Sequence, residues 1–421
     1  MADSAEPTIT EIRRDLHAHA ETGWKEFRTT ALIASELDDE FTLFLGGDAV
    51  NPDERLGVPA DDEIATAIDR ARNEGADEAY LDRMDGITGL VATKEFGDGS
   101  GPTVGVRVDI DALERSEASN DDHQPAREGF ASQHPNAMHA CGHDGHTAIG
   151  LGLARAIDGD HGFNGTLKLF FQPAEEGGRG GKPMSKTSHL DDIEYFLSLH
   201  LGLGQETGTV VASYDNPLSN AKVDAVFEGE PSHAGDKPNE GRNAVQAMAT
   251  AIQNLYAIPR HADGATRINI GQVHSPNPQN IIAEEARMRV EVRGETAGLN
   301  EYMHGAAQRI LKQAAAMHDV DLTTSPYGKT TTFVGDEELI VPVERAAETV
   351  DGVDNVIDRY PFGGSEDASY LIQRVQENGG KATYMGIGAS NPFGHHTARF
   401  DIDEDALQIG VNVLTNIIRS L

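Results

Sequence analysis

The sequence is poor in the features that mark secreted and membrane proteins. It has one cysteine in 421 residues, so no disulfide can form within the chain. No apolar run approaches the roughly 20 residues that a bilayer-spanning helix needs. The first residues are acidic and lack the basic and apolar segments of a secretory signal. We therefore expect a cytoplasmic protein with no membrane partner.

Basic residues are also scarce, and few of them are lysines. The chain has 34 Lys+Arg against 69 Asp+Glu, which gives a formal net charge of -35. Such a charge repels phosphate backbones and argues against a nucleic-acid partner. The acidic residues are spread along the chain, a balance typical of a salt-rich cytosol in which ions screen self-repulsion. We expect an organism that lives at high salt; an ordinary acidic protein is the alternative.

The hydrophobic pattern predicts an α/β fold in the first half and the last quarter of the chain. Short apolar strands alternate there with longer helices, which is typical of a mainly parallel sheet with flanking helices. The polar stretch 41–84, with a helix near 61–75, reads as an inserted surface element. Strands are expected at 87–92, 103–108, 166–171, 195–199, 209–212 and 382–387, and helices at 11–40 (broken at Thr22-Gly23), 146–156, 336–349, 367–377 and 404–420.

The stretch between these two parts has a different pattern, with strands that alternate apolar and polar residues. Its order is β-α-β-β-α-β, which predicts a small α+β sandwich with one exposed sheet face. We therefore expect a catalytic domain in two parts, 1–217 and 329–421, with a smaller domain, 218–328, inserted between them. The six elements are expected at 221–229, 241–258, 266–274, 286–294, 299–318 and 319–325.

The densest group of reactive residues is the run 138–146, Met-His-Ala-Cys-Gly-His-Asp-Gly-His. It contains the single cysteine, Cys141, and His143 two residues later. A thiolate and imidazoles this close together are typical of transition-metal ligation. The alternative is a buried cysteine beside residues that cap a helix, and the nearby histidine favours the metal.

Two adjacent carboxylates, Glu175 and Glu176, follow the predicted strand 166–171. Ligands of open α/β sheets bind at the carboxyl ends of strands. Adjacent side chains cannot point the same way, so one glutamate can bind a metal while the other handles protons. The alternative is a solvated acidic turn, which is common in a chain this acidic.

Further polar residues follow other predicted strands. His200 ends the strand 195–199, and the pair His395 and His396 follows the strand 382–387. Asp109 and Asp111 end the strand 103–108, either shaping the site or lying in solvent. Because these segments are far apart in sequence but all meet one edge of the sheet, we expect them to form a single site.

The inserted domain carries its own candidates. His233 lies in a loop of small residues, and Asn280 and Arg293 flank and end the next hairpin. A guanidinium suits a substrate carboxylate. An ion pair of Arg293 with Glu291 or Glu295 is the more ordinary interpretation and stays open.

Several of these segments together resemble the M20 peptidase/amidohydrolase superfamily, and within it the branch of hippurate and auxin-conjugate hydrolases. Residues 27–31, 41–84 and 364–368 are most similar to the members that hydrolyse p-aminobenzoyl-glutamate. The resemblance covers nearly the whole chain. It rests on residues 13–17, 21–24, 107–113, 139–146, 172–177 and 233–235.

The resemblance implies a zinc-peptidase-like catalytic domain that binds two divalent ions, Mn²⁺ or Zn²⁺, and hydrolyses an amide. Glu175 would be the general base. His396 is preferred to His395 as a ligand because Phe400 lies four residues beyond it, as in the family. The implied metal ligands are Cys141, His143, Glu176, His200 and His396.

The resemblance also implies roles for the inserted domain as a lid that dimerises. His233 would reach the active site of the neighbouring subunit, in a homodimer. Asn280 and Arg293 would hold the substrate carboxylate, with the backbone at Gly364 and Ser365 nearby. One departure is Ala283, where the family usually has proline.

The expected substrate is an N-acyl amino acid, with p-aminobenzoyl-glutamate as the specific prediction. Two lid-loop cations, Lys237 and Arg242, favour glutamate as the amino acid. Three alternatives stay open: a general hippurate-like hydrolase, a metal-bound subunit that supports an active paralogue, and a binding module without catalysis.

Overall fold

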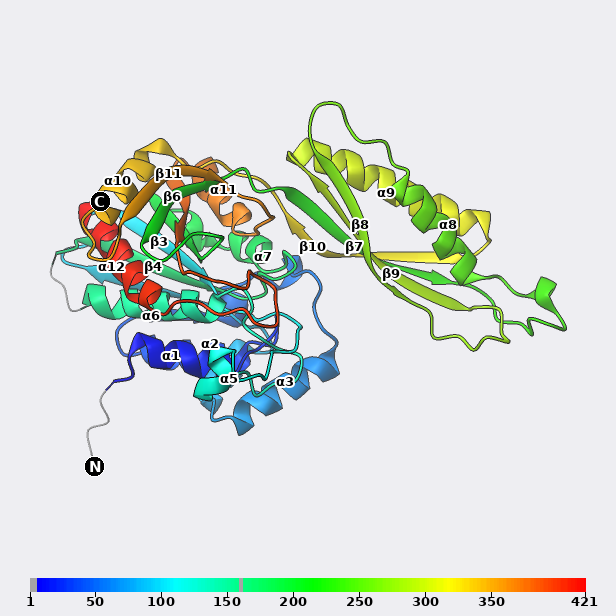
Figure 1. Cartoon of the computed structure of the whole chain (residues 1–421), viewed down its shortest axis with the longest axis horizontal. Helices are drawn as coiled ribbons and strands as arrows, with labels where there is room; N and C mark the ends of the chain where they lie inside the picture. Colours follow the sequence, from blue (N-terminus) through cyan, green and yellow to red (C-terminus); the bar gives the residue numbers. More distant parts are fainter. Residues whose placement is uncertain (1–5, 159–161) are drawn as a thin grey trace. The chain divides into compact units, whose positions relative to one another are not determined.

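The computed structural model describes residues 6–158 and 162–421 and divides into two compact units (Figure 1). The larger unit comprises Met1–Asp215, Phe333–Phe362 and Asp367–Leu421. The smaller comprises Asn216–Thr332 and Gly363–Glu366. The sequence predicts that residues 363–366 belong to the larger domain. They group instead with the smaller unit, where the Leu218 N–H donates to the Gly364 carbonyl at 2.8 Å.

The larger unit is built on an eight-stranded sheet with the order β1-β2-β4-β3-β5-β12-β6-β11. Its four central strands, β4, β3, β5 and β12, are parallel neighbours, while β1, β2 and β4 pair antiparallel, as do β12 and β6. The expected mixed, mainly parallel sheet is thus confirmed. The strands are β1 Thr42–Leu45, β2 Leu90–Phe96, β3 Thr103–Asp109, β4 Gly165–Gln172, β5 Tyr195–Leu201, β6 Thr209–Asp215, β11 Asn355–Pro361 and β12 Lys381–Ile387.

Helices form two apolar layers with this sheet. Residues of α1, α6, α10 and α12 share one buried cluster, and residues of α7 and α11 share another. In α12 the buried Leu407, Val411, Leu414 and Ile418 recur every three or four residues, so one face of the helix is apolar. The helices are α1 Ile9–Ala18, α2 Phe27–Leu37, α3 Asp61–Asn73, α4 Glu78–Met84, α5 Gln124–Glu128, α6 His143–Asp158, α7 Gly181–Ser185, α10 Glu337–Ala347, α11 Ser369–Glu377 and α12 Asp405–Ser420.

The break expected at Thr22-Gly23 is present, because the segment 11–40 forms two helices, α1 and α2, separated by a loop that contains Trp24. Two other expectations for this unit were wrong in detail. The stretch 41–84 is more than a surface insertion, because β1 pairs with β2 and both Leu45 and Val50 are buried. Strand β11 was missed, since its half-exposed edge position leaves it without an apolar run.

The smaller unit is a four-stranded antiparallel sheet, in the order β10-β7-β9-β8, with two helices packed on it. All six predicted elements are present in the predicted order. Ala221, Val223, Ala225 and Phe227 alternate along β7 and are buried, as expected for a sheet with one face covered. The elements are β7 Ser219–Glu228, α8 Ala244–Tyr256, β8 Thr266–His274, β9 Glu285–Gly294, α9 Ala297–Met317 and β10 Asp321–Thr330.

Among the residues that the structure describes, no helix is both long and apolar enough to cross a bilayer.

Candidate active site

Several candidate site residues lie at the carboxyl ends of the four central parallel strands. Asp109 ends β3, His200 lies one residue before the end of β5, and Glu175 and Glu176 follow β4. His396 lies in the loop after β12. Because parallel neighbours end at one edge of the sheet, these distant segments meet, as the sequence predicted.

The five predicted metal ligands and Glu175 form one cluster. Within each of three overlapping groups, the potential ligand atoms lie within 4.8 Å of one another. Cys141 Sγ is 3.5 Å from His200 Nε2, and His396 Nε2 is 3.7 Å from Glu176 Oε1. The groups are Cys141 with His143 and His200, Cys141 with Glu176 and His396, and His143 with Glu175 and Glu176.

Two of the histidines are oriented as metal ligands usually are. His143 Nδ1 donates to the Asp111 carbonyl at 2.8 Å, and its buried Nε2 has no hydrogen-bond partner among the described residues. His200 Nδ1 donates to the Leu201 carbonyl at 2.8 Å. A backbone acceptor on Nδ1 fixes a proton there, so in the neutral imidazole, the form that binds a metal, the lone pair of each Nε2 is left for a cation.

His146 belongs to the same sequence motif but is oriented differently. Its Nε2 accepts the Leu201 N–H at 2.9 Å, so Nδ1 carries the proton and donates to Asp109 Oδ1 at 2.5 Å. Both ring nitrogens are therefore engaged, although the ring lies near Asp109 and His143. His146 positions Asp109 and β5 and is not available as a ligand.

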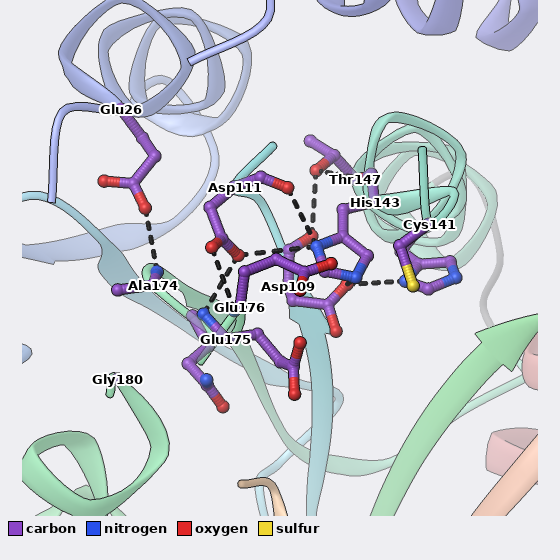
Figure 2. Close-up of polar contacts among 12 residues, drawn as sticks. Glu26, Asp109, Asp111, Cys141, His143, Thr147, Ala174, Glu175, Glu176 and Gly180 are labelled. Carbon is purple, nitrogen blue, oxygen red and sulfur yellow. Dashed lines mark hydrogen bonds and ion pairs between the residues drawn. The ribbon is translucent and has the colours of Figure 1, made fainter. Parts of the chain in front are cut away.

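Asp111 organises the turn that carries the two glutamates. Its Oδ1 accepts the Glu175 N–H at 2.9 Å and its Oδ2 accepts the Glu176 N–H at 3.0 Å. Figure 2 shows how Asp111 links this turn to His143 through its carbonyl. Asp111 is 1% exposed, so these bonds are shielded from water. Asp111 thus sets the positions from which both glutamate side chains start.

The turn itself has a strained backbone that other buried groups support. Ala174 has a positive φ of 52°, which is uncommon outside glycine. Its N–H donates to Glu26 Oε1 at 2.8 Å (Figure 2). Burial and the charge of Asp111 raise the pKa of Glu26 to about 8. Gly180 closes the turn, and a Cβ there would lie 1.7 Å from the Pro173 carbonyl oxygen.

A buried arginine lies next to Asp109. Arg107 Nη1 donates to Asp109 Oδ2 at 2.9 Å, and its Nη2 lies 3.4 Å from Asp367 Oδ1. Asp367 Oδ2 accepts the N–H groups of Gly180 and Gly181 at 3.0 and 2.7 Å. Burial would raise the pKa of Asp109, but the charges of His143 and Arg107 hold it well below its ordinary value. Asp109 is therefore ionised beside the cluster.

The structure separates the two adjacent histidines. His395 Nε2 lies 3.1 Å from the Leu201 carbonyl, and its ring packs on Phe400 with centroids 4.9 Å apart. His396 is the one that reaches Cys141 and Glu176. The His396 N–H donates to the Ala140 carbonyl at 2.8 Å, and the Arg115 guanidinium donates to the His396 carbonyl.

The electrostatics of Cys141 fit a bound cation. Burial and the nearby Glu176 carboxylate raise the pKa of the thiol well above its ordinary value. A divalent cation at the cluster would reverse this effect and bind the thiolate. Together with two imidazole Nε2 atoms that have their lone pairs available, this donor set suits a transition metal of intermediate softness.

A buried charge cluster supports α6 from the side of α1. His17 lies between two carboxylates, with Nδ1 2.8 Å from Asp144 Oδ2 and Nε2 3.0 Å from Glu117 Oε1. Arg13 also donates to Asp144, at 2.8 Å. Burial alone would lower the pKa of His17, but hydrogen bonds to both carboxylates raise it from 6.5 to about 9.

This raised pKa predicts a stability that depends on pH. The stabilisation from His17 is fully present below pH 6.5 and is lost as the pH rises through about 9. At about 1.4 kcal/mol per pKa unit, the free energy of unfolding should fall by about 3 kcal/mol over this window. Urea unfolding at both ends of the window should show this fall in the wild type and most of it missing in His17→Gln. Equal pH dependence in the two proteins would contradict the assignment.

In the smaller unit, two predicted loops lie together. The Ala234 N–H donates to the Asn280 carbonyl at 3.0 Å, and His233 forms an isolated bridge with Ile281. The N–H groups of Gly235 and Asp236 donate to His233 Nδ1 at 3.2 and 3.0 Å. Nδ1 is thus an acceptor, so neutral His233 carries its proton on Nε2.

The charged candidates of the smaller unit have acidic partners. Arg293 Nη2 donates to Glu291 Oε1 at 3.0 Å, the ordinary interpretation that the sequence left open. Lys237 pairs with Glu240 at 3.1 Å, and Arg242 lies 3.6 Å from Glu230. Gly364 accepts the Leu218 N–H, as described above, and the buried Ser365 hydroxyl has no hydrogen-bond partner among the described residues.

A comparison with family models identifies the chain. The model for peptidase family M20/M25/M40 matches residues 105–420. The chain belongs to this family. The resemblance inferred from the motifs is confirmed, and the zinc-peptidase-like fold with an inserted antiparallel domain is the fold of family M20.

Curated M20 relatives match over nearly the whole chain. Indole-3-acetyl-aspartic acid hydrolase of Enterobacter agglomerans is 43% identical, covering 97% of this chain and 94% of the relative. One subunit of the p-aminobenzoyl-glutamate hydrolase of Escherichia coli (strain K12) is 41% identical, covering 98% and 96%.

Solved structures show the same fold. An aminobenzoyl-glutamate utilization protein from Klebsiella pneumoniae superposes with a TM-score of 0.84 at 37% identity, covering 98% of this chain and 95% of that one. A dinuclear metal-binding peptidase of family M20 from Bacillus subtilis superposes with a TM-score of 0.65 at 21% identity, covering 98% and 96%.

Proposed function

We propose that the chain is a metal-dependent amidohydrolase that cleaves the amide bond of an N-acyl amino acid. The observation that carries this proposal is the cluster of Cys141, His143, Glu176, His200 and His396, with Glu175 beside it. Five ligands shared between two cations leave coordination positions for water and substrate, as catalytic sites require. The metal is Zn²⁺ or Mn²⁺, and the thiol and imidazole donors suit Zn²⁺ better.

The names of the relatives support a substrate class. One acts on indole-3-acetyl-aspartic acid and the other on p-aminobenzoyl-glutamate. Both substrates join an aromatic acyl group to an acidic amino acid through an amide bond. We propose the same class here, with p-aminobenzoyl-glutamate as the specific substrate and p-aminobenzoate and glutamate as products. A general hippurate-like hydrolase is the alternative.

The residues of the chain supply the proton transfers. When bound, the two cations would polarise the amide carbonyl and lower the pKa of the attacking water. Glu175 accepts the proton of that water and returns it to the leaving nitrogen. Asp111 and Glu26 hold the backbone of the Glu175 turn through the bonds described above, which keeps the carboxylate in place during both transfers.

The smaller unit is proposed to complete the site. His233 presents an Nε2–H donor, because its Nδ1 accepts two backbone N–H groups. In a homodimer formed through the inserted domain, this donor would stabilise the oxyanion in the active site of the other subunit. Asn280 and Arg293 would bind the α-carboxylate, with the backbone at Gly364 and Ser365. The Escherichia coli relative is named as one subunit of its hydrolase, which also supports a paralogous partner.

The acidic composition supports a proposal about the working environment. A net charge of -35 destabilises a compact chain by self-repulsion unless ions screen it. We propose that the enzyme works in the cytoplasm of a salt-rich cell, and the assays below therefore contain molar salt.

Hydrolysis of p-aminobenzoyl-glutamate by the purified chain tests the proposed function. With Zn²⁺ or Mn²⁺ in molar salt, we expect release of p-aminobenzoate with kcat/KM above about 10⁴ M⁻¹s⁻¹. Indole-3-acetyl-aspartate, hippurate and N-acetyl-amino acids are tested in parallel. Cleavage of hippurate alone would move the substrate to the general N-acyl class. No cleavage of any amide would favour the alternative in which the chain supports an active paralogue.

A further inference from the structure

Arg55 is a cation without an acidic partner in a strongly acidic chain. It is half-buried, its Nε is buried, and its guanidinium forms no hydrogen bond or ion pair with any described residue. Burial lowers the pKa of Arg55, and no nearby carboxylate opposes this effect. Burying an unpaired charge costs stability, so such a group usually has a partner that is absent from the isolated chain.

The Arg55 guanidinium is held near a rigid aromatic side chain. Its central carbon lies 5.6 Å from the centre of the Trp24 ring. Trp24 is 1% exposed, and its Nε1 donates to the Leu56 carbonyl at 2.8 Å. The backbone after Arg55 is thereby fixed to a buried side chain, so the cation is preorganised to receive a ligand.

The segment that carries Arg55 lies directly against the turn of the two catalytic-site glutamates. One guanidinium joins them: Arg179 Nε donates to the Glu176 carbonyl at 2.9 Å, and Arg179 Nη1 donates to the Gly57 carbonyl at 3.3 Å. Gly23 permits this arrangement, because a Cβ there would lie 2.2 Å from Arg179 Nη2. Arg55 is therefore two residues before Gly57, whose carbonyl accepts a hydrogen bond from the same Arg179 guanidinium as the carbonyl of Glu176, a candidate metal ligand.

Two further contacts fix the same segment from its other end. Lys182 Nζ lies 2.5 Å from Glu54 Oε2, and the Asn51 N–H donates to the Pro183 carbonyl at 3.2 Å. The short turn Pro52–Glu54 is thus anchored to the residues that follow the glutamate turn. All of these residues belong to the larger unit, so the link between the Arg55 segment and the glutamate turn does not depend on the smaller unit.

We infer that Arg55 binds the side-chain carboxylate of the acidic amino acid in the substrate. The inference rests on the proposed function and names the residue that selects the amino acid. The cations that the sequence suggested for this role, Lys237 and Arg242, already have acidic partners. A substrate carboxylate would supply the acceptor that Arg55 lacks and can bind the guanidinium with both oxygens. A neutral amide in its place leaves the cation unpaired.

The test compares two substrates that differ only at this carboxylate, p-aminobenzoyl-glutamate and p-aminobenzoyl-glutamine. We expect the wild type to prefer the glutamate conjugate by about 100-fold in kcat/KM, since a site with an unpaired polar group rejects an analogue that lacks its partner. In Arg55→Gln this preference should disappear, mainly through a rise of about 50-fold in KM for the glutamate conjugate. Values for the glutamine conjugate should change less than about threefold.

Two control variants separate recognition from structure. Arg55→Lys keeps the charge but loses the planar fork, so it should restore part of the preference. Arg345→Gln makes the same change of charge at an exposed position of α10 and should leave both substrates unaffected. An equal loss on both substrates in Arg55→Gln, or a wild type without preference, would overturn the inference.

A binding measurement keeps the inference testable if the proposed function fails. Calorimetry measures the affinity of the Zn²⁺- or Mn²⁺-loaded protein for the free amino acids L-glutamate and L-glutamine. We expect L-glutamate to bind more tightly than L-glutamine in the wild type and equally weakly in Arg55→Gln. If the wild type hydrolyses neither conjugate but binds L-glutamate through Arg55, the proposed reaction fails and the recognition stands. No difference between the two amino acids in the wild type would overturn the recognition itself.

Discussion

Replacing Glu175 by glutamine should reduce kcat for p-aminobenzoyl-glutamate by about 1,000-fold or more, because the amide cannot accept the proton of the attacking water. The metal content should stay close to that of the wild type, since Glu175 is proposed to handle protons and its neighbour Glu176 to bind metal. The change is nearly isosteric at a side chain that is 9% exposed, so the fold should tolerate it. Single-turnover kinetics and elemental analysis of the same sample measure both quantities.

The matched variant is Glu176→Gln, one residue further along the same turn. Its N–H is held by the same Asp111 carboxylate, so the two variants share their backbone support. We expect Glu176→Gln to lose metal together with activity. Near-normal turnover in Glu175→Gln would contradict the assignment of Glu175 as the base. Loss of metal in both variants would show that proton transfer and metal binding are not divided between the two glutamates.

Replacing Cys141 by serine should weaken metal binding at least about 100-fold, because removing a ligand costs more than removing a residue that only orients one. Without a cation, burial and Glu176 keep the thiol protonated, as its raised pKa shows. Metal binding must therefore release the thiol proton, so the affinity of the wild type should rise with pH. Competition with a chelator at several pH values should show a smaller slope in Cys141→Ser.

His395→Gln is the control for this experiment. His395 lies beside the cluster, with its ring centroid 5.4 Å from that of His200. Its Nε2, however, is engaged by the Leu201 carbonyl. We expect this variant to bind metal with nearly wild-type affinity. A loss of metal as large as that of Cys141→Ser would mean that His395 is itself a ligand.

The sequence predicted the cluster because its members are marked locally. Cys141 and His143 share one short motif, and Glu175 and His200 stand at or just after the ends of apolar strands. Parallel pairing then brings strand ends together without any knowledge of side-chain contacts. Strands β1 and β11 were not predicted, because β1 is only four residues long within a polar, acidic stretch, and β11 is a half-exposed edge strand without a continuous apolar run.

Supporting residues could not be predicted, because their partners are distant in sequence. Glu26 holds Ala174, 148 residues away, and Arg107 meets Asp367, 260 residues away. The acidic partners of the lid-loop cations could not be predicted either. The sequence therefore suggested Lys237 and Arg242 as available to bind a substrate, although both have acidic partners. Arg55 had no signal at all, because the absence of a partner can be recognised only in three dimensions.

The helix that begins with His143 has a consequence for biosynthesis. α6 packs against α12, and the predicted ligand His396 lies in the loop between β12 and α12. The whole smaller unit and five strands of the large sheet are translated between His143 and these two partners. A nascent chain therefore holds its first ligands long before the last one. The ligand set is complete only after the segment that follows β12 has been synthesised. Chains truncated before that segment therefore lack a complete metal site.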